Sequence, residues 1–275
     1  MTREEASERV AAAFEAGIAP WSRSTRLQIT CGLPVDAATG QPIRGVNTWL
    51  LELAGIERRY RNRFWTTQHR WEVLGGEVVR GEGTPVLVED EDERAEGERV
   101  LFNLEQVEVR PGAPAAALER FWIAPPRFPD YDLAQRLLDA TGAKVIPGDQ
   151  CLCLIHVDSQ LDHIIMPPQE EFLGGLPEWW SVLFHELIHW LVLGRNRFGW
   201  FGEESRGELI AEAGAAELTS HCGIPMSHDL ESNGDHVGAW VRGTREDLWY
   251  FESPCDLAWM AAQHVANFSR WEMPA

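Results

Sequence analysis

The sequence is poor in lysine and contains no long apolar run. Lys144 is the only lysine among 24 basic residues. Nearly every positive charge is therefore a guanidinium, which favours planar stacking and bidentate contacts over a point charge. No segment approaches the roughly 20 apolar residues of a membrane span, and the charged first residues lack the apolar core of an export signal. We therefore expect a soluble protein with no membrane partner.

Disulfide bonds and general nucleic-acid binding are also unexpected. The five cysteines form no paired framework, and their odd number suits the reducing cytoplasm. A net charge of −19 opposes general attraction to nucleic acid. However, residues 1–80 carry 11 arginines against 9 acidic residues, whereas residues 81–275 carry 13 basic against 34 acidic residues. We therefore expect a cytoplasmic protein. Any contact with DNA is expected on one local face of the first half.

The most informative motif is the run His-Glu-Leu-Ile-His at residues 185–189. His185 and His189 are four residues apart, so on a helix their imidazoles point to the same side. Zn²⁺ is well bound by two neutral imidazoles and one carboxylate, with a fourth position left for water. Glu186 is then placed to take a proton from that water. This pattern is typical of zinc peptidases, although it leaves Mn²⁺ open as the metal.

Nineteen residues after His189 comes Glu208, the first of two acidic residues spaced four apart. Glu208 and Glu212 also share one helix face, so one can bind the metal while the other orients a ligand imidazole from behind. Zinc peptidases of the gluzincin type use a similar arrangement. We expect Glu208 to be the third ligand and Glu212 the supporting group, with the reverse assignment open. His236 is a candidate donor to the oxyanion of the tetrahedral intermediate, although a surface or capping role is the simpler interpretation.

Hydrophobic periodicity and turn residues predict an α+β fold. In the first half they predict helices packed beside a small antiparallel sheet, with helices over 2–18, 45–54 and 67–74 and strands over 77–80, 85–89, 99–103 and 107–109. The proline-rich stretch 111–129 divides the chain, and we place the boundary between residues 125 and 126. Beyond it we expect helices over 131–141, 205–222, 235–242 and 254–268, a helix carrying residues 185–189, and strands over 144–146, 151–158 and, at the sheet edge, 162–166.

Several blocks of the sequence resemble the ArdC-type antirestriction proteins of plasmids, phages and mobile elements. In the first half these blocks are residues 15–21, 38–47, 65–68, 74–86 and 102–107, and in the second half they are 162–167, 184–190 and 208–212. The sequence departs from the family pattern at Ile43, where an aromatic residue is usual, and at Gly81, where a lysine is usual. The resemblance implies a single-stranded-DNA-binding domain over 1–125 and a zincin-like metallopeptidase domain, of the gluzincin HExxH type, over 126–275.

The expected DNA surface lies in the first half. Single strands are usually held by backbone charge together with aromatic stacking. We predict phosphate contacts from six arginines and base stacking by Trp65; the arginines are Arg44, Arg58, Arg59, Arg61, Arg63 and Arg80. The simpler interpretation is that the run 58–63 is a solvated loop and that most of the 13 tryptophans are buried.

Three hypotheses remain open at this point. The first is an antirestriction-type protein that binds single-stranded DNA and carries a peptidase-like zinc centre. It would act either by covering the strand or by cleaving a protein substrate near it. The second is a binding module whose metal is structural. The third is an intracellular metallopeptidase that does not bind DNA.

Overall fold

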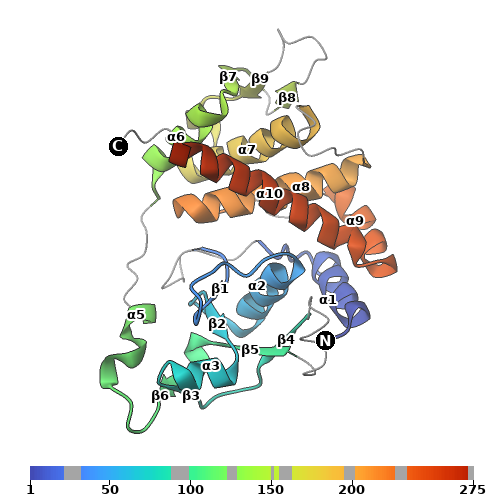
Figure 1. Ribbon diagram of the computed structural model, residues 1–275. Coiled ribbons are helices and arrows are strands. Elements are labelled where there is room, and N and C mark those ends of the chain that lie inside the picture. The colour runs from blue at the N-terminus through green and yellow to red at the C-terminus, as the bar shows by residue number, and fades with distance from the viewer. Residues whose placement is uncertain are drawn as a thin grey trace.

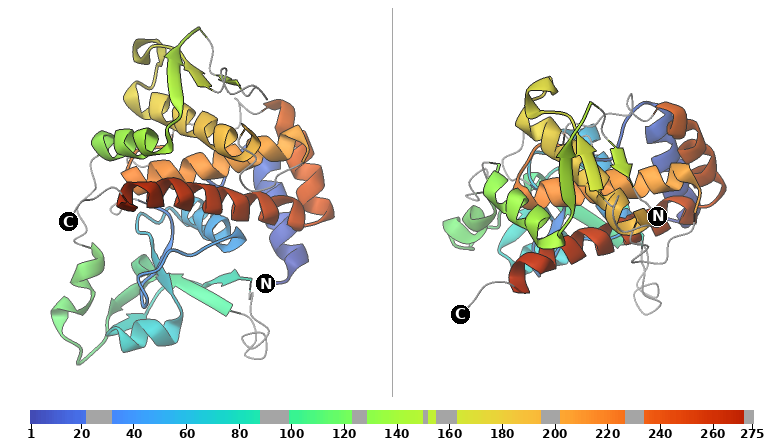
Figure 2. Two further views of the ribbon diagram at one scale, coloured as in Figure 1. Left: turned by 45° about the horizontal axis from the view of Figure 1, so that its top comes forward. Right: turned by 90° about the horizontal axis from the view of Figure 1, so that it is seen from above.

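The computed structural model confirms the expected α+β architecture (Figure 1). It describes residues 1–21, 32–87, 99–122, 129–149, 152–154, 163–194, 202–226 and 234–271. Helices α8 (Glu204–Cys222) and α10 (Trp249–Trp271) cross the middle of the molecule. The small sheets of the first half lie on one side of them, and α6 (Tyr131–Thr141) and α7 (Leu176–His189) lie on the other (Figures 1 and 2).

The first half combines short helices with two small sheets. Its helices are α1 (Arg3–Glu15), α2 (Val46–Arg58), α3 (Gln68–Val73) and α5 (Glu119–Trp122). Its strands are β1 (Val35–Asp36), β2 (Phe64–Thr66), β3 (Gly76–Val78), β4 (Thr84–Val86), β5 (Arg99–Asn103) and β6 (Val107–Val109). One sheet has the order β1-β2-β5-β4 and is antiparallel except for the parallel pair β1-β2, and β3 pairs with β6 in a second sheet.

Local signals explain where several helices begin and end. At the start of α1, the Thr2 hydroxyl accepts the backbone N–H of Glu5, and the Glu5 carboxylate accepts the N–H of Thr2. Asp130 caps α6 through the N–H of Leu133. The same helix ends at Gly142, whose φ of 73° is accessible to glycine at little energetic cost. These helix boundaries are therefore encoded by the sequence itself.

The second half holds five α-helices and a three-stranded sheet among the described residues. The strands are β7 (Lys144–Pro147), β8 (Leu152–Leu154) and β9 (His163–Met166), and the remaining α-helix is α9 (Gly234–Glu246). A π-helical turn at Trp190–Gly194 follows α7. The prediction that residues 162–166 form an edge strand is wrong. β9 pairs with β7 on one side and β8 on the other, because the inward-facing Ile164 and Met166 pack into the core. No helix of the described ranges is long and apolar enough to span a bilayer.

The two halves share one hydrophobic core. Helix α1 packs against α9, and the ring of Phe14 lies 5.4 Å from Trp240 and 5.8 Å from Phe251, measured between centroids. Trp21 lies 6.1 Å from Trp240 in an edge-on arrangement. The Ser7 hydroxyl donates a hydrogen bond to the carbonyl of Thr244. Residues 1–21 are thus packed against the second half, and the predicted boundary at 125/126 falls outside the described residues.

This shared core predicts cooperative unfolding. Phe14→Ala removes a fully buried ring that contacts both halves, so we expect the free energy of unfolding to fall by about 3 kcal/mol. Urea denaturation followed by tryptophan fluorescence and by circular dichroism should give one shared transition for both probes. Val73→Ala is the control, since Val73 is 74% exposed, and it should change stability by less than about 0.5 kcal/mol. Two separate transitions, only one of which shifts, would contradict a shared core.

Candidate metal centre and candidate DNA surface

Helices α7 and α8 pack closely enough for their polar side chains to meet. A Cβ atom added at Gly214 would lie 2.8 Å from Cγ1 of Ile188, so only glycine allows this approach of α8 to α7. His185 and His189 occupy the last turn and a half of α7 and are 8% and 9% exposed. Glu208 and Glu212 project from the first half of α8.

Three of these side chains converge on one point. One ligand atom each from His185, His189 and Glu208 lies within 4.8 Å of the other two. The two imidazole Nε2 atoms are 3.0 Å apart, and the Glu208 carboxylate oxygens lie 3.2 Å from His185 Nε2 and 3.3 Å from His189 Nε2. Ligand atoms bound tetrahedrally at the usual zinc distances of 2.0–2.1 Å are about 3.3 Å apart. The spacing of the three groups therefore fits one such cation.

Glu212 contacts the opposite side of the first imidazole. Its Oε1 atom lies 3.1 Å from Nδ1 of His185, and its side chain is 1% exposed. A proton held at Nδ1 leaves the Nε2 lone pair directed toward His189 and Glu208. A carboxylate in this position orients an imidazole for metal binding and increases its basicity.

The charges at this centre are strongly coupled. Burial alone lowers the pKa of His185, but the carboxylates of Glu208 and Glu212 outweigh burial and raise that pKa to about 10. Burial raises the pKa of Glu208, yet its contacts with His185 and His189 bring the pKa well below its usual value. Without a metal, a proton on His185 therefore supplies the positive charge that the buried carboxylates require.

Two further residues, predicted as the base and as the oxyanion donor, are not among the side chains that converge. Glu186 follows His185 on α7 and is half-buried. His236 is the third residue of α9 and is also half-buried. Within the described ranges, the group of side chains that can hold a metal consists of His185, His189 and Glu208.

The six predicted DNA-binding arginines differ in their surroundings. Arg58 donates to the carbonyl of Glu82 over 2.6 Å, Arg80 pairs with Glu108 at 2.9 Å, and Arg61 lies 4.0 Å from Glu105. The guanidinium of Arg63 lies 5.4 Å from the ring of Phe64. Arg44 lies 4.2 Å from the ring of Trp259 on α10. Arg59 is exposed at the left-handed end of α2, and no carboxylate pairs with it among the described residues.

The prediction that Trp65 stacks on a DNA base is wrong for this structure. Trp65 has no exposed surface, because its strand lies inside the four-stranded sheet and its ring packs edge-on against Tyr60. Trp21, Trp49 and Trp71 are buried as well. The simpler interpretation of the tryptophans as core residues therefore applies to these four, whereas Trp122 at the end of α5 is exposed.

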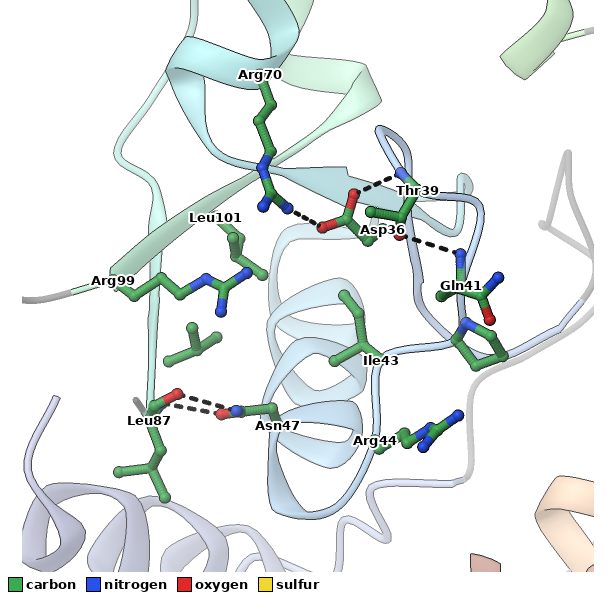
Figure 3. Close-up of a pocket in the computed structure, with 12 residues that line it drawn as sticks. Asp36, Thr39, Gln41, Ile43, Arg44, Asn47, Arg70, Leu87, Arg99 and Leu101 are labelled. Atoms are coloured by element: carbon green, nitrogen blue, oxygen red, sulfur yellow. Dashed lines mark hydrogen bonds and ion pairs between the residues drawn. The ribbon is translucent and has the colours of Figure 1, made fainter. Parts of the chain in front are cut away.

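The first half contains a cavity that was not predicted from the sequence. It has a volume of about 450 Å³, and we call it the N-terminal cavity (Figure 3). The residues that characterise it are Asp36, Ile43, Arg44, Arg70, Val86, Arg99 and Leu101. Among them, only Arg44 was predicted to contact DNA, and Ile43 was noted as a departure from the family pattern. The cavity is formed by four separate segments, so no local pattern could have revealed it.

Comparisons with known proteins agree with this arrangement. Residues 1–111 match the family model described as the N-terminal domain of anti-restriction factor ArdC, and residues 132–250 match a zincin-like metallopeptidase model. A comparison with curated proteins finds no match.

Two crystal structures of the antirestriction protein ArdC from plasmid R388 are similar over the whole chain. The Mn(II)-bound structure has a TM-score of 0.72 at 24% identity, covering 99% of this chain and 100% of ArdC. The metal-free structure has a TM-score of 0.73 at 24% identity, covering 99% of each chain. The resemblance indicated by the sequence motifs is thus confirmed: the first part of the chain matches the ArdC N-terminal domain, and the second part matches a zincin-like metallopeptidase domain.

Proposed function

We propose that this chain is an antirestriction-type protein that binds single-stranded DNA and carries a metal-dependent peptidase centre. The observation that best supports the peptidase centre is the convergence of His185, His189 and Glu208 at the junction of α7 and α8. The proposal includes a cytoplasmic location, which is consistent with the free, buried thiols of Cys222 and Cys255.

The proposed metal ligands are His185, His189 and Glu208, with Glu212 supporting His185. Glu208 is preferred as ligand because its carboxylate faces both Nε2 atoms, whereas Glu212 faces Nδ1. Zn²⁺ suits this donor set, and Mn²⁺, which the R388 protein holds, is the alternative. When bound, such a metal acidifies a water molecule and polarises a peptide carbonyl.

The protein residues would supply the proton transfers. Glu186 would accept the proton of the attacking water and pass it to the leaving amine of a protein substrate. His236 would donate a hydrogen bond to the oxyanion. The buried imidazoles are held in place by their α7 helix and, for His185, by the carboxylate of Glu212.

For DNA, we propose that Arg44, Arg58, Arg59, Arg61, Arg63 and Arg80 form the phosphate-binding face. The Arg80–Glu108 pair is exposed on both sides, and the Arg61–Glu105 pair is 4.0 Å long with its arginine exposed, so each can be broken at a cost of about 1 kcal/mol or less. They therefore weaken but do not prevent phosphate contact. These same ion pairs are the observation that favours the alternative, a metallopeptidase without DNA binding.

Paired variants of the two glutamates test the ligand assignment. Glu208→Gln should abolish stoichiometric metal binding, because the buried site then retains only two imidazoles. Glu212→Gln should weaken metal binding by about 10- to 100-fold, as expected for a supporting carboxylate. Metal content after dialysis, measured by plasma mass spectrometry, distinguishes the two variants. His69→Ala, at an exposed position, is the control and should keep full metal content. The opposite ranking would assign Glu212 as the ligand.

Removal of Glu186 tests the catalytic role. Glu186→Gln should keep full metal content but reduce metal-dependent cleavage of fluorescent casein by about 10²- to 10⁴-fold. Unchanged cleavage would exclude Glu186 as the base. A metal-loaded wild-type protein that cleaves nothing would instead support a binding module with a structural metal.

Metal affinity should depend on pH through His185. The pKa of His185 is raised from 6.5 to about 10 in the metal-free fold, so its contacts stabilise that fold fully below about pH 6.5 and are lost as pH rises through about 10. Metal must displace this proton, so its affinity should rise by about tenfold per pH unit between roughly pH 6 and 9. Competition with a chromophoric chelator measures this slope. A flat profile would show that His185 is neutral before the metal binds.

Arginine substitutions test the DNA surface. Arg59→Gln should lower affinity for a labelled oligonucleotide and reduce the slope of log affinity against log salt by about 0.7, the value for one phosphate contact on a single strand. Arg80→Gln should have a smaller effect because Glu108 already neutralises Arg80. Arg136→Gln, exposed on α6, removes the same charge elsewhere and is the control for fluorescence anisotropy. Equal effects of all three substitutions would contradict the proposed face.

A further inference from the structure

Two tryptophans of the described ranges leave much of their side chain in solvent. Trp122, at the end of α5, is 36% exposed, and Trp249, at the start of α10, is 54% exposed. An exposed indole forgoes the free energy that buried aromatic rings gain by leaving water. The charges around these two side chains differ, and they indicate what each ring could bind.

Helix α5 is anchored through the residue before Trp122. Phe121 is 5% exposed, and the centroid of its ring lies 5.1 Å from that of Phe64 and 5.5 Å from that of Trp71. Successive residues of a helix point about 100° apart, so the buried Phe121 leaves Trp122 directed away from this core contact. The exposed indole is therefore presented on a fixed piece of backbone.

A hydrogen bond joins α5 to the arginine-rich segment 58–63, which we call the basic run. The carbonyl of Phe121 accepts it from the Asn62 side-chain amide at 3.1 Å, and Asn62 directly follows Arg61. Arg61 and Trp122 are thus each one residue away from the two ends of this bond. Because consecutive Cα atoms are about 3.8 Å apart, the two side chains lie within reach of neighbouring nucleotides of one strand.

The basic run is held by buried contacts. Asn62 has no exposed surface: its carbonyl accepts from Asn103 at 2.8 Å, and its Oδ1 atom accepts the N–H of Phe64 at 2.9 Å. The Glu105 carboxylate accepts the backbone N–H groups of Arg61 and Asn62. The arginines therefore project from an ordered backbone, which lowers the entropic cost of binding a ligand.

The charge around Trp122 favours an anion. Segments 58–63 and 119–122 together contain five arginines and one acidic residue, Glu119. Arg120 is exposed, its guanidinium lies 4.6 Å from the ring of Phe121, and no carboxylate pairs with it in the described part of the chain. An exposed ring beside guanidinium groups is the combination that holds single strands, by base stacking and phosphate contact.

The surroundings of Trp249 have the opposite charge. Glu246, Asp247 and Glu252 lie within three positions of it along the chain, and of these Glu252 pairs with Arg3 at 2.5 Å. The other two carboxylates would repel a phosphate near this ring. Trp249 is therefore a matched control, an exposed tryptophan that a strand should avoid.

We propose that Trp122 stacks on one base of the single strand, and that Arg61 and Arg120 contact the phosphates next to that base. This inference rests on the proposed function, because it specifies where the strand is held. It replaces the buried Trp65 by Trp122 as the stacking tryptophan and adds Arg120 to the phosphate-binding face. Every base has a π face, so this site accepts any base.

The test measures binding of two labelled strands to the full-length protein by fluorescence anisotropy. Trp122→Ala should reduce affinity for an oligothymidylate about tenfold but change affinity for an abasic strand of the same length by less than about twofold, because only the first has bases to stack. Trp122→Phe keeps a ring and should retain most of the affinity. Trp249→Ala should change neither affinity. Arg120→Ala should weaken both strands and reduce the salt slope by about 0.7, the value for one phosphate contact.

The outcomes separate this inference from the proposed function. If the wild type binds oligothymidylate but Trp122→Ala behaves like Trp249→Ala, or weakens both strands equally, base stacking on Trp122 is overturned and DNA binding stands. If the wild type binds neither strand, the proposed DNA binding fails and this inference fails with it. Circular dichroism checks the fold of Trp122→Ala. Trp122→Leu, which keeps apolar bulk without a ring, repeats the comparison if the alanine variant is unfolded: it should lose the preference for bases, and a retained preference overturns the stacking role.

Discussion

The contact between α7 and α8 determines how the second half can function. Glu212 is 1% exposed, and a carboxylate at that depth requires a positive partner or several hydrogen-bond donors. His185 lies against it, and Gly214 gives α8 the close approach to Ile188 that the contact needs. Removing one member of a buried charged pair usually destabilises a protein by about 3–5 kcal/mol. The residues proposed to bind the metal are therefore also residues on which the packing of the two helices depends.

At this contact, a proton on His185 and the proposed metal ion would exclude each other. In the metal-free fold, the Glu208 and Glu212 carboxylates raise the pKa of His185 and so favour its protonated form. A divalent cation bound as proposed would supply more positive charge at the same place and would release that proton. Protonated His185 therefore lets the two helices pack at this site without a metal.

The sequence predicts those features that are encoded locally. The helix predicted over 131–141 is observed as α6 with the same bounds, and the four-residue spacing of His185 and His189 placed both imidazoles on one face. Features that arise from distant segments were missed or wrong. Trp65 was expected to be a stacking surface, but its burial depends on neighbouring strands that are far away in the sequence. The central position of β9 and the N-terminal cavity likewise depend on which strands pair.

The acidity of the chain constrains how it could hold DNA. With a net charge of −19, the approach of a polyanion gains little from the overall field, so affinity must come from short-range contacts. Charges separated by more than about 8 Å of solvent are largely screened at physiological ionic strength. Most of the acidic residues lie after residue 80, whereas α2, with Arg58 in its last turn, lies in the first half, on the other side of α10 from α7 (Figures 1 and 2). A strand held in the first half would therefore lie across α8 and α10 from the metal centre. In that geometry the proposed metal centre and the proposed DNA surface are separate sites on the two sides of these helices.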